Sequence, residues 1–272
     1  MAIQVDTPRE ILLVEPAHLR PMMGFGVLEP LPSRHIPYEM VDPFILVHEA
    51  DITITPERAD LDTKHPHRGF DNLWYLIKGE ASTGHSTGPN GAFERARLRA
   101  GSLLFIRTGR GVWHAEGLGQ DEVNEGKAGT EFRGVLFWVN LARKDKGVEP
   151  SVQVVNPENV PVRREAEAIV RVLVGEGSPV QLGTPGLIYD VELPKGGAFT
   201  TPVPSGFNGF VYMLEGEATL GANLRRAVRS DIAVLGQGRE LSVQKAQPGT
   251  RFMLMAAKPY RESPIFNGPY VD

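Results

Sequence analysis

The sequence predicts an all-β protein, and three observations indicate this fold class. Short runs rich in Val, Ile, Leu, Phe and Tyr recur along the 272 residues and are punctuated by Gly, Pro, Asn and Asp. The 30 glycines and 22 prolines are scattered between these runs, which favours many turns over long helices. Amphipathic helix periodicity is weak, and its best candidate, residues 163–168, is too short to anchor a helical domain. A β-sandwich or β-barrel is therefore expected.

The expected strands follow one another with turn residues between them. In the first half of the chain they are FILVHEADITI (44–54), LWYLIKGEAST (73–83), SLLFIRTG (102–109) and GVLFWVNL (134–141). In the second half they are AIVRVLVG (168–175), LIYDVEL (187–193), FVYMLEGEATL (210–220), DIAVLG (231–236) and RFMLMAA (251–257). Each run contains the β-branched or aromatic residues that pack well on a pleated surface.

The chain also repeats itself, which predicts two copies of one β-barrel. An offset of 137 residues (206 − 69) superposes GFDNLWYLIKGEA (69–81) on GFNGFVYMLEGEA (206–218) without a gap. Some twenty residues further on, AGSLLFIRTGR and RSDIAVLGQGR form a second matched pair. The polar stretch 142–151 suits a connection between the copies. We therefore expect an N-terminal domain over 1–145 and a C-terminal domain over 146–272.

Two short motifs place metal-ligating residue types in alternating pairs. HPHRGF begins at His65, and GRGVWHAE ends at Glu116. Alternate side chains of a strand share a face, so His65 lies beside His67, and His114 beside Glu116. Two such strands facing one another would offer three nitrogens and one oxygen to a single cation. The chain has no cysteine, and this mixed set suits iron, nickel, copper or zinc better than calcium or magnesium.

The repeat separates the chemistry of the two copies. The positions that match His65 and His67 are Pro202 and Pro204, and all seven histidines lie at or before His114. Histidines that served only to build the barrel would be expected in both copies. We therefore expect a metal site in the first barrel and none held by histidine in the second.

These motifs resemble those of the pirin family, two-barrel proteins of the cupin superfamily that carry metal in the amino-terminal barrel. The similar segments are HPHRGF, GRGVWHAE, FWVNL and the closing FMLMAAKPYRESPIFNGPYVD, and the resemblance covers most of the chain. It implies an all-β bicupin built of two tandem cupin (jelly-roll) β-barrel domains. Carried over residue by residue, it places the metal ligands on His65, His67, His114 and Glu116.

The resemblance also implies a cofactor and an activity. The cofactor is one divalent transition metal, with iron as the usual ion and nickel, cobalt, manganese, copper or zinc as alternatives. Several members are quercetin 2,3-dioxygenase-like, and others have a redox-responsive regulatory role. Two positions depart from the family pattern, because Asp71 stands where Glu is usual and His85 about where Asp is common. Both changes fall where they would alter the rim of the pocket.

Further side chains are assigned roles with their alternatives. Arg68 either orients the substrate or a carboxylate behind the ligands, or forms a surface salt bridge. Asp71 either supports a ligand from behind or is a surface acid at a strand end. Glu116 is either a fixed ligand or also the catalytic base that takes a proton from a hydroxylated substrate. The remaining histidines lack a partner at ligand spacing and are predicted to be surface or loop residues: His18, His35, His48 and His85.

Two functional hypotheses follow. The first is a non-haem, metal-dependent dioxygenase acting on a flavonol or similar aromatic hydroxy-ketone, with a small aromatic substrate and dioxygen as its partners. The alternative is a redox-responsive regulatory module, in which a structural or sensing iron alters a surface that binds a protein partner. Another reaction at the same metal, such as isomerisation or hydrolysis, would proceed without oxygen.

Composition narrows these hypotheses. The formal net charge is −4 with no basic stripe, so no nucleic-acid partner is expected. No uninterrupted apolar run reaches the roughly 18 residues of a spanning helix, so no membrane partner is expected either. The first residues lack the basic start, apolar stretch and cleavage site of a signal peptide. Together with the absence of cysteine, this predicts a cytoplasmic protein.

Overall fold

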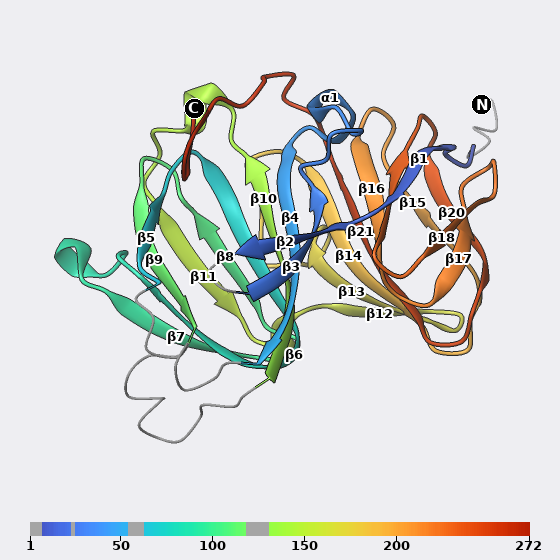
Figure 1. Cartoon of the computed structure of the whole chain (residues 1–272), viewed down its shortest axis with the longest axis horizontal. Coiled ribbons are helices and arrows are strands. Elements are labelled where there is room, and N and C mark those ends of the chain that lie inside the picture. The colour runs from blue at the N-terminus through green and yellow to red at the C-terminus, as the bar shows by residue number, and fades with distance from the viewer. Residues whose placement is uncertain (1–6, 23–24, 54–62, 118–130) are drawn as a thin grey trace. The chain divides into compact units, whose positions relative to one another are not determined.

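The structure is a computed structural model that describes residues 7–22, 25–53, 63–117 and 131–272. Strands dominate it (Figure 1), which confirms the all-β prediction. The chain divides into two compact units, each assembled from three segments. The N-barrel comprises Leu19–Glu29, Phe44–Val160 and Glu262–Asp272, and the C-barrel comprises Met1–His18, Pro30–Pro43 and Pro161–Arg261.

The N-barrel is built on one ten-stranded sheet. The main path, in hydrogen-bonded order, is β11 (Ser151–Val155), β8 (Leu103–Arg107), β6 (Phe70–His85), β10 (Glu131–Asn140), β4 (Phe44–Thr53), β3 (Phe25–Leu31) and β2 (His18–Met22). Three strands join it off this path: β5 (His65–His67), β7 (Glu94–Arg99) and β9 (Val112–Gly117). Short 3-10 turns occur at Pro89–Gly91, Arg143–Asp145 and Pro157–Asn159.

Strand β6 links the main path to the strand that carries His114. Its residues up to Gly79 pair with β8 and β10, whereas its residues from Glu80 onward pair with β7 and β9. Gly79 lies at the changeover with φ +79°, and a Cβ there would come within 1.9 Å of the Glu131 carbonyl oxygen. Only glycine fits this conformation and this close backbone approach, so Gly79 permits the bend in β6.

The C-barrel consists of a seven-stranded and a four-stranded sheet. The larger runs β1 (Ile11–Pro16), β19 (Asp231–Leu235), β16 (Asn208–Glu215), β21 (Thr250–Ala257), β14 (Gly186–Leu193), β13 (Ala168–Val174) and β12 (Val162–Glu165). The smaller runs β15 (Gly197–Pro202), β20 (Glu240–Ala246), β17 (Glu217–Leu220) and β18 (Arg225–Val228). Residues 163–168, the best helix candidate of the sequence, contribute to β12 instead.

The two units repeat one topology. The order β11-β8-β6-β10-β4-β3-β2 of the N-barrel corresponds to β1-β19-β16-β21-β14-β13-β12 of the C-barrel. The sequence repeat fixes the alignment, because its 137-residue offset places β6 on β16. In the same way β5-β9-β6 of the N-barrel corresponds to β15-β20-β17 of the C-barrel. Duplication of one barrel therefore accounts for both units.

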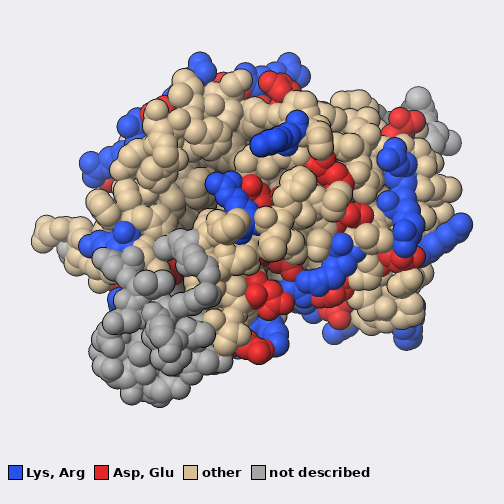
Figure 2. Space-filling model, viewed as in Figure 1, with Lys and Arg blue, Asp and Glu red and all other residues tan. Residues whose placement is uncertain are grey.

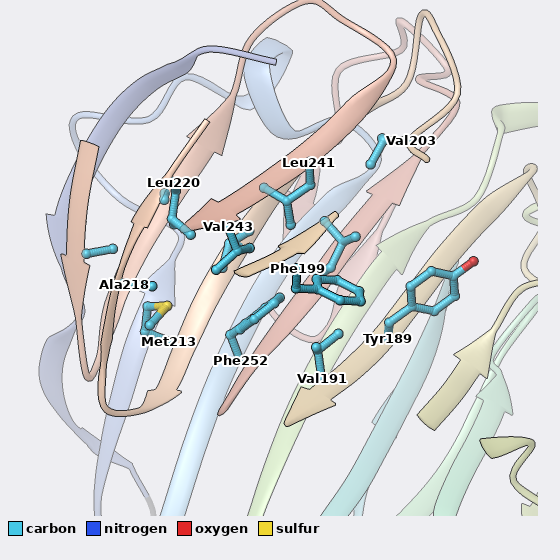
Figure 3. Close-up of a cluster of buried hydrophobic side chains, with 14 of the residues drawn as sticks. Tyr189, Val191, Phe199, Val203, Met213, Ala218, Leu220, Leu241, Val243 and Phe252 are labelled. Carbon is cyan, nitrogen blue, oxygen red and sulfur yellow. The ribbon is translucent and has the colours of Figure 1, made fainter. Parts of the chain in front are cut away.

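A cluster of buried apolar side chains fills the C-barrel (Figure 3). Phe252, Leu254 and Ala256 alternate along β21 and belong to this cluster, as the two-residue period of a strand requires. The Phe199 and Phe252 rings lie 6.2 Å apart at its centre. Each fully buried side chain of this size stabilises the fold by about 1.5–3 kcal/mol. The N-barrel has a core cluster of its own, which includes Trp74.

The compact units differ from the contiguous domains expected over 1–145 and 146–272. Strand β1, at the start of the chain, pairs antiparallel with β19 and completes the C-barrel sheet. In that sheet β1 lies beside β19, just as β11 lies beside β8 in the N-barrel. Residues Glu262–Asp272, which follow the last C-barrel strand, belong to the N-barrel. The outermost strand beside β19 in the C-barrel sheet therefore comes from the start of the chain.

The remaining elements are short. Helix α1 (Tyr38–Val41) belongs to the C-barrel, and strands β22 (Phe266–Asn267) and β23 (Tyr270–Val271) form a hairpin in the N-barrel. Among the described residues, no helix is long and apolar enough to cross a membrane. On the face shown in Figure 2, basic and acidic side chains are interspersed over the residues that are drawn in colour. The signal-peptide argument rests on residues 1–14, of which 1–6 lie outside the described part.

Candidate metal centre

The pairing of β5 with β9 brings the three predicted histidine ligands together. His65 lies opposite His114 in this antiparallel pair, and His67 lies opposite Val112. The Nε2 atom of His65 is 3.0 Å from Nε2 of His67 and 2.8 Å from Nε2 of His114. The candidate ligand atoms of the three imidazoles all lie within 4.8 Å of one another. The convergence expected from strand alternation is therefore present for the three histidines.

Glycines at two turns position these strands. The turn between β8 and β9 has Gly109 at φ +45° and Gly111 at φ +140°, and a Cβ at Gly109 would lie 2.1 Å from the Val148 carbonyl oxygen. Gly69, directly after β5 in the HPHRGF motif, has φ +89°, and a Cβ there would lie 1.8 Å from the Val271 carbonyl oxygen. Both motifs thus contain glycine because the backbone approaches other backbone too closely for a side chain.

Hydrogen bonds from Nδ1 fix the tautomer and the orientation of the His65 and His67 imidazoles. Nδ1 of His65 lies 2.6 Å from the Thr63 carbonyl oxygen, and Nδ1 of His67 lies 3.2 Å from the Pro269 carbonyl oxygen. A carbonyl oxygen can only accept, so each Nδ1 carries the proton and each Nε2 has a free lone pair. Neutral imidazoles with Nε2 lone pairs aimed at one point are the donor set that a transition-metal ion requires. The residues therefore fit a metal ion.

Burial keeps the imidazoles of His67 and His114 neutral. It lowers the pKa of His67 to about 3, assisted by the neighbouring imidazoles of His114 and His65. Burial also lowers the pKa of His114 to about 3, with contributions from His65 and His85. An imidazole must be unprotonated to bind a metal, so both rings are in the binding form at neutral pH.

Glu116 lies on the edge of the cluster. One carboxylate oxygen, Oε1, is 3.8 Å from Nδ1 of His114, the nitrogen that faces away from the other two imidazoles. It stands outside the group of atoms within 4.8 Å, so its role as the fourth ligand stays a prediction. Desolvation raises the pKa of Glu116, while His65, His67 and His48 oppose this shift. Nδ1 of His114 is buried and has no hydrogen-bond partner within the described residues. A small movement of the Glu116 carboxylate toward this nitrogen would give it one.

Aromatic side chains form one wall beside His67. Its ring lies 5.2 Å from the ring of Phe70 and 4.9 Å from that of Trp138, between centroids. Phe70 and Trp138 stack on each other at 4.2 Å with an interplanar angle of 24°. The indole Nε1 of Trp138 is buried without a hydrogen-bond partner in the described part of the chain. In this wall Phe70 is fully buried, and Trp138 is partly exposed and carries one unused donor.

The C-terminal segment fastens the backbone beside the cluster. The amide of Val271 donates to the Arg68 carbonyl oxygen at 2.9 Å. The ammonium of Lys146 is buried and donates to the carbonyl oxygens of Gly69 (2.8 Å) and Val271 (3.0 Å) and to Oδ1 of Asn140 (2.8 Å). We call residues 269–272 with these contacts the C-terminal strap. The strap supplies both the acceptor for His67 and the partner of the HPHRGF backbone.

The two further predicted residues have other partners. Arg68 pairs with Asp272 at 2.8 Å, and both side chains are well exposed, at 46% and 39%. Of the two roles predicted for Arg68, these contacts match the surface salt bridge. Asp71 is fully buried and accepts two hydrogen bonds from Arg107, at 2.9 and 3.0 Å. Its neighbour Phe70 faces His67, so Asp71, the next residue of the strand, points to the opposite face of β6.

Two histidines predicted to lie on the surface or in loops are buried instead. His48 on β4 is 3% exposed and its Nε2 lies 2.6 Å from Oε2 of Glu29, a carboxylate that also accepts from Arg20. His85, at the end of β6, is 6% exposed and lies opposite His114 in the pairing with β9. The prediction was wrong for these two because it considered ligand spacing alone. The apolar run 44–47 before His48 was the signal that the strand is buried.

The strap yields a prediction about metal affinity. Removing residues 269–272 deletes the acceptor of His67 Nδ1, and losing such support behind a ligand weakens metal binding about 10–100-fold. The Arg68→Gln variant removes only the exposed ion pair and should keep the wild-type affinity within about twofold. Competition with a chromophoric chelator measures both. Equal affinity of the truncated and full-length chains would show that the strap does not support the site.

Fold and site together define the class. The chain has two tandem barrels of one topology, and only the first contains a histidine cluster. This is the architecture of a bicupin with one candidate metal centre. The family described as "Pirin" matches residues 25–139, and "Pirin C-terminal cupin domain" matches residues 188–272. Pirin from Rattus norvegicus is 31% identical over 245 residues, which cover 86% of this chain and 77% of that protein. The chain belongs to the pirin family, as its motifs indicate.

Solved structures confirm the bicupin fold. Quercetin 2,3-dioxygenase from Acinetobacter baumannii is 25% identical with a TM-score of 0.81, over 97% of this chain and 91% of that chain. GK1651 from Geobacillus kaustophilus is 26% identical with a TM-score of 0.79, over 95% of this chain and 100% of that chain. Both likenesses span both barrels, so the two-barrel prediction holds for the whole architecture.

Proposed function

We propose that the N-barrel binds one divalent transition metal through His65, His67 and His114, with Glu116 as the fourth ligand. The observation that carries this proposal is the convergence of three imidazoles on one point, with Nε2 separations of 3.0 and 2.8 Å. Iron is our first candidate, and nickel, cobalt, manganese, copper and zinc accept the same ligands. Elemental analysis of protein purified without added metal identifies the ion.

We infer further that the chain is a non-haem dioxygenase acting on a flavonol or similar aromatic hydroxy-ketone. Its likeness to a quercetin 2,3-dioxygenase supports this inference, as does the wall of Phe70 and Trp138 beside His67. A bound metal would supply Lewis-acid and redox chemistry to dioxygen and to the substrate oxygens. Trp138, the partly exposed ring of this pair, would pack against a planar substrate, and its Nε1 would donate to one of the substrate oxygens. Glu116, a desolvated carboxylate, would take the proton of the substrate hydroxyl.

Oxygen uptake tests this activity. Protein loaded anaerobically with Fe(II) is mixed with quercetin in air-saturated buffer, and we expect about one dioxygen consumed per quercetin. Trp138→Phe keeps an aromatic ring at the wall but removes the indole donor, so it should lower kcat/KM by about tenfold, the worth of one hydrogen bond of about 1.4 kcal/mol. No uptake with any of the six metals would refute the dioxygenase. Turnover without oxygen would instead indicate isomerisation or hydrolysis.

The second candidate function is a redox-responsive binding module. The C-barrel favours it, because Pro202 and Pro204 stand where the N-barrel has His65 and His67. A duplicated barrel without histidine is available to bind a protein partner. In this case the affinity for the partner would differ between the ferrous, ferric and metal-free forms. Equal affinities of the three forms would exclude it.

A further inference from the structure

The C-barrel contains a cavity of about 590 Å³ that the metal chemistry does not use. It lies where strand β13 ends and β14 begins, and Pro204 and Phe207 complete its wall. Val174, Leu187 and Tyr189 contribute buried side chains to the lining. Cavities of 300–1,000 Å³ with a mainly apolar lining and few polar groups are typical of small-molecule sites.

This cavity is the counterpart of the metal-site interior in the other barrel. The 137-residue offset places Pro204 on His67 and Phe207 on Phe70. The sheet register extends the match to Tyr189, which lies across from Leu254 just as His48 lies across from Leu136. The two leucines correspond, because Leu254 also pairs with Val211 and Leu136 with Trp74, and these two positions are 137 residues apart.

Tyr189 gives the cavity a hydrogen-bonding group. The residue is 7% exposed, and Figure 3 shows its hydroxyl pointing away from the cluster around Phe199 and Val191. Within the part of the chain that the structure describes, no residue forms a hydrogen bond with this hydroxyl. Gly175 leaves space beside it, because a Cβ there would lie 3.4 Å from the hydroxyl oxygen. The hydroxyl is therefore available to a bound polar atom, and one such hydrogen bond contributes about 0.5–1.5 kcal/mol.

The wall of the cavity is held in place before any ligand binds. The buried guanidinium of Arg9 donates to the carbonyl oxygens of Pro204 at 2.7 Å and Phe207 at 2.9 Å. On the other side, the Arg163 guanidinium lies 4.9 Å from the centre of the Tyr189 ring. Fixed walls reduce the ordering that binding must otherwise bring about.

The charges select the kind of ligand. Among the lining residues, all of which the structure describes, Glu176 has the one formally charged side chain. No cationic side chain lines the cavity, because the Arg9 guanidinium is bonded to the Pro204 and Phe207 carbonyls and the Arg163 guanidinium lies over the Tyr189 ring. Phosphates and carboxylates are therefore disfavoured. We propose that the C-barrel binds a neutral aromatic molecule, with its ring against Phe207 and a hydroxyl or carbonyl oxygen on the Tyr189 hydroxyl. This site is separate from the metal centre and does not depend on the proposed oxygenase activity.

Calorimetric titration of the full-length chain with 2-naphthol tests the proposal, with 2-naphthoate as the anionic counterpart of the same shape. We expect 2-naphthol to bind and 2-naphthoate to bind at least tenfold more weakly. His67→Ala should leave the affinity for 2-naphthol unchanged, which distinguishes this cavity from the metal centre. Failure to bind 2-naphthol, equal binding of both probes, or loss of binding in His67→Ala would each overturn the proposal.

Three variants locate the bound probe. Tyr189→Phe removes one hydrogen bond and should weaken 2-naphthol about 2–10-fold. Leu182→Trp places a larger side chain in the lining loop and should weaken it more than tenfold. Val162→Trp, on exposed β12, is the matched control and should have no effect. Unfolding curves accompany each titration. Equal affinities of the wild type and the folded Leu182→Trp variant would place the probe elsewhere and refute the assignment.

Discussion

His67→Ala is expected to abolish tight metal binding while leaving the chain folded. His67 supplies one of three converging Nε2 atoms, and its loss leaves two imidazoles to hold the ion. Disturbing only the support behind a ligand costs about 10–100-fold in affinity, so removing the ligand itself should cost more than about 100-fold. Metal content after anaerobic Fe(II) loading and gel filtration should fall from about one ion per chain to near zero. Any oxygen uptake with quercetin should disappear with it.

The duplicated barrel provides the matched control. Pro204 occupies the position of His67 in the C-barrel, so Pro204→Ala makes the corresponding change where no imidazole is present. It should retain the wild-type metal content. The folded state of His67→Ala is checked by its circular dichroism and urea midpoint, because an interior cavity next to Phe70 and Trp138 costs some stability. A folded His67→Ala protein with a full complement of metal would refute the assigned centre.

Lys146→Met is expected to destabilise the fold by about 2–4 kcal/mol. The Lys146 ammonium makes three hydrogen bonds, and bonds to a charged group contribute about 1.5–3 kcal/mol each. Burial opposes this gain, since it lowers the pKa of Lys146 to about 8 and so penalises the charged form by roughly 3 kcal/mol. Methionine fills the same space but removes three charged hydrogen bonds, although the Gly69 carbonyl keeps a second donor, the Leu141 amide. The midpoint of urea unfolding should fall with an unchanged slope.

Lys144→Met is the control for this change. Lys144 lies two residues earlier in the same 3-10 turn and is exposed, so its replacement should alter stability by less than about 0.5 kcal/mol. Because Lys146 joins the Gly69 and Val271 carbonyls, Lys146→Met should also weaken metal binding in the direction of the 269–272 truncation. Equal stability of the two methionine variants would show that the ammonium contributes no net stabilisation.

Local periodicity predicted much of the fold and the core of the site. Each of the nine expected strands overlaps an observed strand, because runs of β-branched and aromatic residues are sufficient to identify a sheet. The three histidines could be grouped because alternation places His65 and His67 on one face, and the repeat showed which barrel carries them.

Partners distant in sequence could not be predicted in the same way. His48 lies in the first part of β4, where nearly every residue is buried and a two-residue period does not show which side chains face inward. Its partner Glu29 is on another strand, and no local pattern joins them. The same holds for Lys146 and Val271, which are 125 residues apart. Contacts of this kind depend on how the sheets close, which is a property of the whole chain.

The exchange of terminal segments has a consequence for biosynthesis. The ribosome must complete the entire C-barrel before it adds Glu262–Asp272, the segment that finishes the N-barrel. Until then His67 lacks its Pro269 acceptor, and Lys146 lacks the carbonyl of Val271. Nascent chains therefore have an incomplete ion site throughout elongation. The proposed tight binding of metal would therefore follow translation, and a chain terminated early would be released as a poor metal binder.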